Sequence, residues 1–159
     1  MKITILAVGK VKEKFYRQAI EEFEKRLSRY CKLEIVEVAD EKTPDNASDA
    51  EELQIKEKEG QRLIKRLKGD AWTCVLSIDG KMLDSVEFSE KLEGLGVSGI
   101  SHMVFIIGGS LGLAESILKR ADYALSFSKM TFPHQLMRVV LLEQIYWGYR
   151  IMANEPYHK

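Results

Sequence analysis

The stretch HMVFIIGGSLG, residues 102–112, joins the most apolar segment of the chain to a glycine-rich turn. Its first half is a short run of β-branched, aromatic and other apolar residues, which is typical of a strand buried in a sheet. Gly108 and Gly109 end that run at once, and glycines allow a tight turn and a close approach of the backbone to a neighbour. This stretch therefore predicts a buried strand followed by a tight loop.

Strand-like and helix-like segments alternate on both sides of this stretch. Strands are expected over residues 2–8, 33–39, 72–78, 102–107 and 123–127. Helices are expected over about 12–30, 48–67, 85–95, 114–120 and 134–151. Five strands with helices between them predict an α/β fold whose parallel sheet carries helices on both faces. A chain of 159 residues is expected to form one domain, residues 1–159.

Charge and composition exclude several classes of protein. The 24 Lys and Arg balance the 24 Asp and Glu, and this zero net charge argues against binding of nucleic acid through bulk electrostatics. The apolar runs are too short to cross a membrane. Cys31 and Cys74 are far apart and have no C-x-x-C partner, which argues against structural zinc and fits reduced thiols. We therefore expect a cytoplasmic protein with neither membrane nor metal.

The final helix-like segment, residues 134–151, is apolar around almost its whole circumference. Such a helix must be covered on all sides, and the sheet of so short a chain covers only one. We therefore expect a second subunit to cover the other side, in a twofold homodimer with Leu142 in the interface. The alternative is a monomer with an unusually buried terminal helix.

In open α/β sheets, ligands bind beyond the carboxyl ends of the strands. Four candidate turns follow strands in this chain, and they begin at Gly9, Asp79, Gly108 and Ser126. None of them matches a phosphate-binding loop or the dinucleotide glycine fingerprint, which argues against a standard kinase, ATPase or NAD enzyme.

Residues 108–112 also match the G-x-S-x-G pattern of serine hydrolases, with Asp122 and His134 following in the order of a catalytic triad. The pattern is short and permissive, so a small hydrolase that uses Ser110 remains a rival hypothesis. The rival without catalysis is an α/β dimer that binds a nucleotide or RNA.

Three separated motifs together resemble one family over the whole chain. They are FIIGGSLG (105–112), LSFSKMTFPH (125–134) and EPYHK (155–159). In this order they resemble the ribosomal RNA large subunit methyltransferase H family, a minimal branch of the SPOUT superfamily. The resemblance implies a deep C-terminal trefoil knot and a homodimer packed through it. It also implies S-adenosylmethionine as methyl donor and N3 of a pseudouridine in 23S rRNA as acceptor, in the large subunit or the assembled ribosome.

The resemblance also implies which residues bind the cofactor. They are Leu76, Gly108, Phe127, Ser128, Lys129, Met130, Thr131 and Phe132. An adenine ring needs an apolar slot and close main-chain approach, which glycines and apolar side chains at these strand ends would provide. Each apolar member of the set is also a plausible core residue, and without the resemblance the core is the favoured interpretation.

Methyl transfer is an in-line displacement, so the enzyme mainly positions donor and acceptor. The proton on N3 must leave, and His158 is the best candidate base because the unperturbed pKa of histidine is about 6.5. Tyr157 could stack on a base and Lys159 could hold a phosphate. Arg138 is a candidate either for positioning substrate or for an interface pair. The alternative for the last three residues is a frayed terminus.

Contacts to RNA are expected from cations near the end of the first strand, together with residues of the later motifs. These are Lys10, Lys12, Lys14, Arg17, Lys129 and Lys159. Where the family's final helix is expected to carry an arginine, this chain has Trp147, and Arg150 is a candidate replacement. With no separate RNA-binding domain, we expect one subunit to bind the cofactor and the tail of the other to reach the substrate base.

Overall fold

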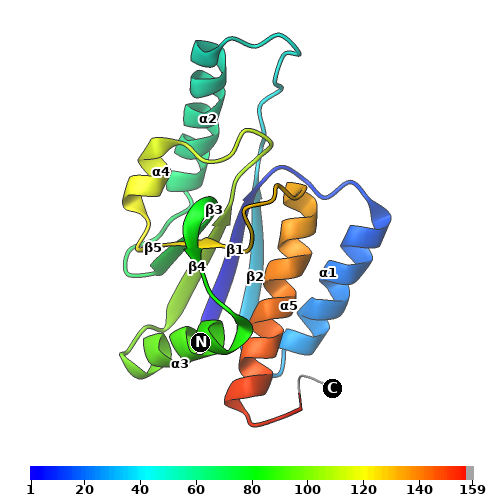
Figure 1. Cartoon of the computed structure of the whole chain (residues 1–159), viewed down its shortest axis with the longest axis vertical. Coiled ribbons are helices and arrows are strands. Elements are labelled where there is room, and N and C mark those ends of the chain that lie inside the picture. The colour runs from blue at the N-terminus through cyan, green and yellow to red at the C-terminus, as the bar shows by residue number, and fades with distance from the viewer. Residues whose placement is uncertain (157–159) are drawn as a thin grey trace.

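The computed structural model describes residues 1–156 and contains five strands and five helices in that part of the chain (Figure 1). The strands are β1 (Lys2–Val8), β2 (Lys32–Val38), β3 (Trp72–Met82), β4 (His102–Ile107) and β5 (Tyr123–Ser126). The helices are α1 (Lys14–Leu27), α2 (Asp49–Ile64), α3 (Ser85–Val97), α4 (Glu115–Arg120) and α5 (His134–Met152). The order and type of every predicted element are confirmed.

The five strands form one sheet in the order β2-β1-β4-β3-β5, and every pair is parallel. Helices α1, α3 and α5 cover one face, and α2 and α4 cover the other (Figure 1). Two hydrophobic cores result, because neighbouring residues of a strand point to opposite faces. Phe105 of β4 belongs to the first core, while Val104 and Ile106 belong to the second. The predicted α/β fold is confirmed.

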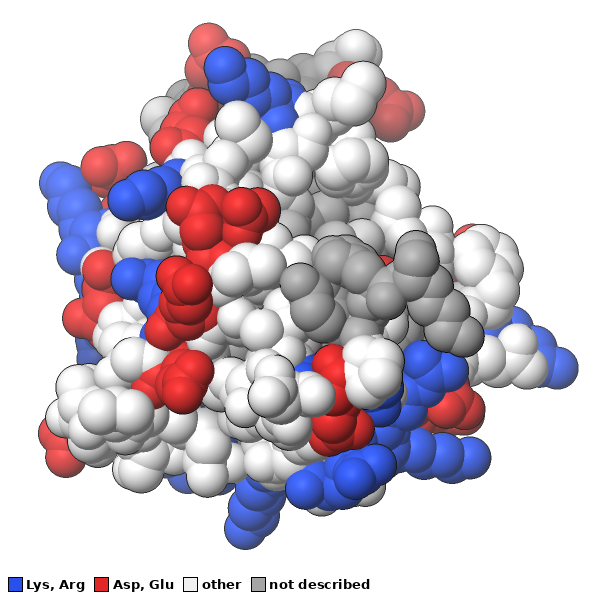
Figure 2. Space-filling view, turned by 60° about the horizontal axis from the view of Figure 1, so that its bottom comes forward, with Lys and Arg blue, Asp and Glu red and all other residues white. Residues whose placement is uncertain are grey.

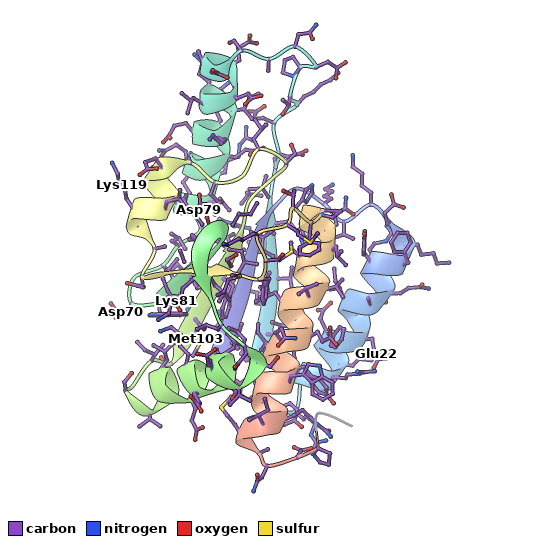
Figure 3. The ribbon with its side chains drawn as sticks, in the orientation of Figure 1. Glu22, Asp70, Asp79, Lys81, Met103 and Lys119 are labelled. Atoms are coloured by element: carbon purple, nitrogen blue, oxygen red, sulfur yellow. The ribbon has the colours of Figure 1, made fainter. Side chains whose placement is uncertain are left out.

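Strand β3 continues past the predicted end at residue 78 and pairs with β5 twice. Leu125 pairs with Leu76 and again with Lys81, so the register of β3 against β5 shifts between these two residues. Gly80 lies in this shifted part of β3, between the exposed Asp79 and Lys81 that Figure 3 labels. A Cβ at Gly80 would come within 2.7 Å of the carbonyl carbon of Ala124. This close approach of β3 to the backbone of β5 therefore requires glycine at position 80.

Helix α5 has no exposed residue from His134 to Met152. Leu142 is fully buried in the core of its own subunit, so its expected place in a dimer interface is wrong. The sheet and the flanking helices α1 and α3 already cover much of α5. Leu136, Val140 and Ile151 are half-buried and, among the described side chains, lie outside both core clusters.

The described residues contain no helix that is long and apolar enough to cross a membrane. They also contain no group of three or more His, Cys, Asp or Glu side chains arranged to hold a metal ion.

Candidate functional site

Three of the sequence-predicted segments lie side by side because of the strand order. Strand β3 is the neighbour of both β4 and β5. All three strands run in the same direction, so Leu76, Gly108 and Phe127 lie at or just beyond neighbouring carboxyl ends. This edge of a parallel sheet is where such folds bind ligands.

Gly108 and Gly112 form a tight turn after β4. The N–H of Gly112 donates to the carbonyl oxygen of Gly109 at 3.0 Å, and Gly112 has a φ of +88°, which glycine adopts easily. A Cβ at Gly108 would lie 2.9 Å from the carbonyl carbon of Gly112. The turn therefore brings main chain, rather than side chain, to the edge where a ligand would lie.

The loop after β5 is held by its own serines. The Ser126 hydroxyl donates to the carbonyl oxygen of Ser128 at 3.0 Å, and the Ser128 hydroxyl accepts the N–H of Met130 at 2.9 Å. Met130 and Phe132 remain 72% and 40% exposed, so neither side chain belongs to the core. This arrangement fits an apolar slot better than a core.

Leu76 and Phe127 are half-buried and pack against the first core, so their side chains have structural as well as candidate ligand roles. Lys129 and Thr131 are exposed in the same loop as Met130. The structure therefore brings all eight predicted cofactor positions to one end of the sheet.

A buried carboxylate lies beneath the glycine turn, and sequence reasoning missed it. Glu59 of α2 is only 5% exposed, and a Cβ at Gly109 would lie 3.2 Å from its Oε1. Its Oε2 accepts the N–H of Glu41 at 2.9 Å. Burial raises the pKa of Glu59, and the charges of Asp40 and Glu41 add to the rise, whereas the hydrogen bond from the Glu41 N–H and the charge of Arg62 oppose it. Its place beside Gly60 and Leu63 on the buried face of α2 is the pattern that could have revealed it.

Replacing Glu59 with Gln is expected to change how stability depends on pH. Because the folded pKa is raised, the stability that the proton contributes is complete below the unfolded value of about 4.3 and is lost as pH rises through the folded pKa. The natural protein should therefore lose stability relative to Glu59→Gln as the pH rises from 5 to 8. Urea unfolding followed by tryptophan fluorescence measures this difference.

The exposed Glu57→Gln on the same helix controls for the loss of a charge from α2. An equal stability difference for Glu59→Gln at both pH values would contradict the assignment of Glu59 as a carboxyl that is protonated more readily in the folded state.

Arg138 is buried to 1% exposure at the first turns of α5. Its Nη2 donates to the carbonyl oxygen of Gly9 at 2.7 Å, and its Nη1 forms an ion pair with Glu37. Leaving the buried guanidinium without its carboxylate partner would be costly. Arg138 thus ties α5 to the carboxyl ends of β1 and β2, and within the protomer it has no exposed surface for a substrate. This geometry favours a positioning role over direct contact with the substrate.

The predicted RNA-contacting cations at the start of α1 lie close to α5. Lys10, Lys12, Lys14 and Arg17 are exposed. The backbone N–H of Lys12 donates to Oε1 of Gln135 at 3.0 Å, which places this segment beside the beginning of α5. Tyr157, His158 and Lys159 lie outside the described residues.

The geometry argues against the serine hydrolase. Ser110 follows the carboxyl end of β4, whereas Asp122 precedes β5 and accepts the N–H of Thr73 at the beginning of β3. Because the strands are parallel, Ser110 and Asp122 lie at opposite ends of the sheet. A triad needs its members within hydrogen-bond reach of one another, so these residues do not form one.

Comparisons with known proteins agree with this picture. The sequence profile of a family described as "Predicted SPOUT methyltransferase" matches residues 1–158. A protein of Bifidobacterium adolescentis named ribosomal RNA large subunit methyltransferase H is 65% identical, with 100% of both chains covered. One of the same name from Clostridium tetani is 60% identical over the same coverage.

The solved structures with a similar fold share much less sequence identity with this chain. A "probable methylase family protein" from Haemophilus influenzae aligns with a TM-score of 0.54 at 10% identity, covering 99% of this chain and 70% of that one. At this level of identity, the likeness supports the fold alone.

Proposed function

The chain belongs to the SPOUT methyltransferase family, and on that premise we propose that it methylates ribosomal RNA of the large subunit. It is an S-adenosylmethionine-dependent methyltransferase. The name shared by relatives at 65% and 60% identity supports an rRNA acceptor. The proposed acceptor atom is N3 of a pseudouridine in 23S rRNA. Each protomer would contribute to the site through one domain, residues 1–159. The protein would act in the cytoplasm, where ribosomes are.

The residues at the carboxyl edge suit the cofactor. Gly108, just after β4, has no room for a side chain. Met130 and Phe132 expose apolar surface in the loop after β5, which is separated from β4 by β3 alone. When bound, S-adenosylmethionine supplies a methyl group on a positively charged sulfur. We assign its binding to Leu76, Gly108 and residues 127–132. The meeting of these three strand ends is the observation that carries the proposal.

The acceptor must lose a proton as the methyl group arrives. His158 is proposed as the base, because histidine can accept a proton near neutral pH. Tyr157 would stack on the target base, and Lys159 would contact a phosphate. Arg138 would orient these groups indirectly, by fixing the start of α5 against β1 and β2.

The terminal residues begin far from the cofactor edge of their own protomer. Helix α5 starts at that edge and spans 19 residues, about 28 Å, to the opposite edge of the sheet. There the hydroxyl of Tyr30, two residues before β2 begins, donates to Glu155 at 2.8 Å. Three residues reach at most about 11 Å when fully extended. Residues 157–159 would therefore serve the cofactor site of a partner subunit, in a homodimer.

The side of α5 away from the cores supports a homodimer. Leu136, Val140 and Ile151 repeat at spacings of 4 and 11, so they lie along one side of the helix. They are half-buried but outside both cores of the described protomer. We propose that the same side of α5 in a second copy covers them, which gives the self-complementary contact of a twofold dimer.

Replacing Val140 with Glu is expected to convert the dimer to monomers, because it would bury an unpaired charge in the interface. Sedimentation velocity at micromolar protein measures the change, and methyl transfer should be lost with it. Val97→Glu is the matched control, since Val97 is 84% exposed at the end of α3. An unchanged sedimentation coefficient for Val140→Glu would rule out this surface as the interface.

The charge distribution supports selection of a structured target over generic RNA binding. Figure 2 shows both basic and acidic side chains on the face that lies at the bottom of Figure 1, as the zero net charge leads one to expect. Affinity for RNA would depend on a few cations, namely Lys10, Lys12, Lys14, Arg17, Lys129 and Lys159. Such a protein would bind naked RNA weakly and would depend on the shape of the large subunit or the ribosome.

The function is tested by transfer of a labelled methyl group to assembled ribosomes, free large subunits and naked 23S rRNA in parallel. Particles that carry uridine in place of the acceptor pseudouridine are the matched control. We expect transfer to a particle with pseudouridine and little to the control or to naked rRNA. Absence of transfer to all three substrates, despite binding of S-adenosylhomocysteine by calorimetry, would favour the non-catalytic binder.

A further inference from the structure

Helix α5 ends in a reversal that turns the chain back along its own last turn. Asn154 has a φ of +60°, a left-handed conformation that asparagine tolerates better than most residues. The N–H of Glu155 then donates to the carbonyl oxygen of Arg150 at 2.8 Å, and that of Asn154 to Ile151 at 3.0 Å. Such bonds are typical of helix C-terminal caps. They place Glu155 and Pro156 within reach of the Arg150 side chain.

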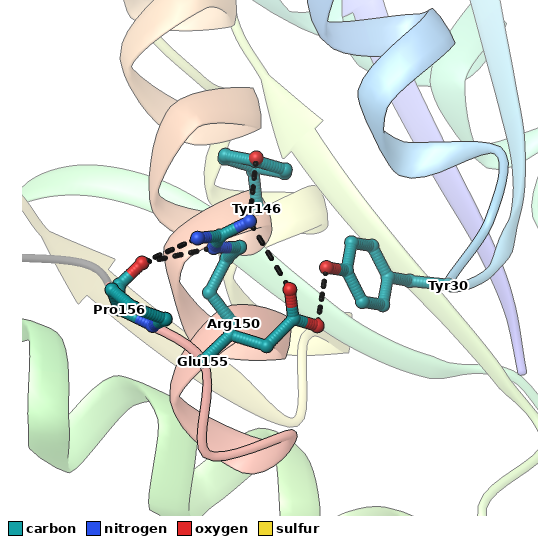
Figure 4. A network of polar contacts seen from close by, with 5 residues as sticks. All are labelled: Tyr30, Tyr146, Arg150, Glu155 and Pro156. Carbon is teal, nitrogen blue, oxygen red and sulfur yellow. Dashed lines mark hydrogen bonds and ion pairs between the residues drawn. The ribbon is translucent and has the colours of Figure 1, made fainter.

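The Arg150 guanidinium holds this returning segment from two directions (Figure 4). Its Nη2 and Nε both donate to the carbonyl oxygen of Pro156, at 2.6 and 3.1 Å. Its Nη1 lies 3.1 Å from Oε2 of Glu155. The planar guanidinium of arginine carries several N–H donors in fixed directions and can make these contacts at the same time. The single ammonium group of lysine cannot reproduce this arrangement.

Tyr30 connects the same segment to the turn between α1 and β2. Its hydroxyl donates to Oε1 of Glu155 at 2.8 Å, so the two carboxylate oxygens of Glu155 have different partners. Burial and this hydrogen bond raise the pKa of Tyr30, which keeps the hydroxyl protonated as a donor. The Tyr30 ring also stacks on Tyr149 at 5.6 Å between centroids. Glu155 is thereby joined to the turn between α1 and β2 as well as to α5.

We propose that Tyr30, Arg150 and Glu155 form a clamp that fixes the position and direction in which the chain leaves Pro156, and that Arg150 is thereby a positioning residue for methyl transfer. This inference rests on the proposed function, in which the residues after Pro156 act in the partner's site. Nε, Nη1 and Nη2 of Arg150 all have partners within the protomer. These partners favour a positioning role for Arg150 over direct contact with RNA.

The test compares Arg150→Ala with Arg26→Ala. Both guanidinium groups lie over the ring of Tyr146, at 5.8 and 5.6 Å from its centroid, but only that of Arg150 contacts the terminal segment. A displacement of about 1 Å can cost 100-fold in rate, so Arg150→Ala should slow single-turnover methyl transfer about 10- to 100-fold. The dissociation constant for S-adenosylhomocysteine should stay within about twofold, because cofactor binding does not use the clamp. Arg26→Ala should stay within about twofold in both measurements.

Arg150→Lys keeps the charge but loses the planar guanidinium, and it should resemble Arg150→Ala rather than the natural protein. Amide hydrogen exchange provides a readout that does not need activity: exchange at the Glu155 N–H should accelerate in both Arg150 variants and not in Arg26→Ala. A rate within twofold of the natural protein, unchanged exchange, or full rescue by lysine would overturn the clamp. Failure of the natural protein itself to methylate any ribosomal substrate would instead count against the proposed function.

Discussion

Deleting residues 157–159 is expected to abolish detectable methyl transfer while leaving the affinity for S-adenosylhomocysteine nearly unchanged. The deletion removes the proposed base, and general base catalysis alone typically contributes 100- to 10,000-fold in rate. Loss of the groups that stack on the base and hold phosphate should lower the rate further. The proposed cofactor residues all lie at the other edge of the sheet, so calorimetry should show a dissociation constant within about twofold. Loss of cofactor binding would show that the tail belongs to the cofactor site.

A subunit-mixing experiment separates a tail that acts in the partner's site from one that acts in its own. The deletion protein is mixed with Gly108→Ala, whose Cβ would lie 2.9 Å from the backbone of Gly112 and so distort the cofactor turn. Neither homodimer should be active. A mixed dimer would combine one intact cofactor turn with one intact tail from the other subunit, so mixing should restore activity. Continued inactivity after verified subunit exchange would refute the shared site.

Replacing Gly80 with Ala is expected to cause a large loss of stability. The new Cβ would come within 2.7 to 2.8 Å of backbone atoms of Ala124 and Leu125, and backbone in a sheet cannot move aside as a flexible side chain can. Overpacking costs about 1–3 kcal/mol and sometimes more, so we expect about 3 kcal/mol or failure to fold. Urea unfolding measures the change in free energy.

Gly94→Ala is the matched control for Gly80→Ala. Gly94 lies in α3, and a Cβ there would meet nothing within 4 Å. Alanine suits a helix better than glycine by about 0.5–1 kcal/mol, so this variant should be at least as stable as the natural protein. If Gly80→Ala unfolded at the same urea concentration as Gly94→Ala, the described close approach of Gly80 to the backbone of β5 would be wrong.

The segment around Gly80 is one that the local sequence pattern does not predict correctly. Asp79 and Gly80 look like a turn that ends the third strand, and local sequence offers no reason to continue it. The structure pairs Lys81 and Met82 with β5, some 44 residues further along the chain, because long-range hydrogen bonds outweigh the local preference. The trefoil knot that the family resemblance implies stays a prediction.

The candidate site was predictable in part. Ligands of parallel sheets bind beyond the carboxyl ends of the strands, and these ends lie together at one edge of the sheet. This rule selected the turns that begin at Gly108 and Ser126. It did not reveal Glu59, whose burial beneath Gly109 depends on how α2 packs. It also suggested roles for Arg138 and Arg150 at a ligand or RNA surface, whereas both guanidinium groups have partners inside the protomer.

Sequence by itself determined the α/β fold, the order of its elements and the end of the sheet at which the proposed cofactor loops lie. These features follow from the spacing of apolar residues along the chain and from the shared direction of parallel strands. Only the tertiary structure decided that Leu142 lies inside its own core, that β3 pairs with β5 again after a shift in register, and that the described chain ends about one helix length from the proposed cofactor site of its own protomer. Each of these depends on which distant segments pack together, and burial between segments is a property of the folded chain that no local pattern contains.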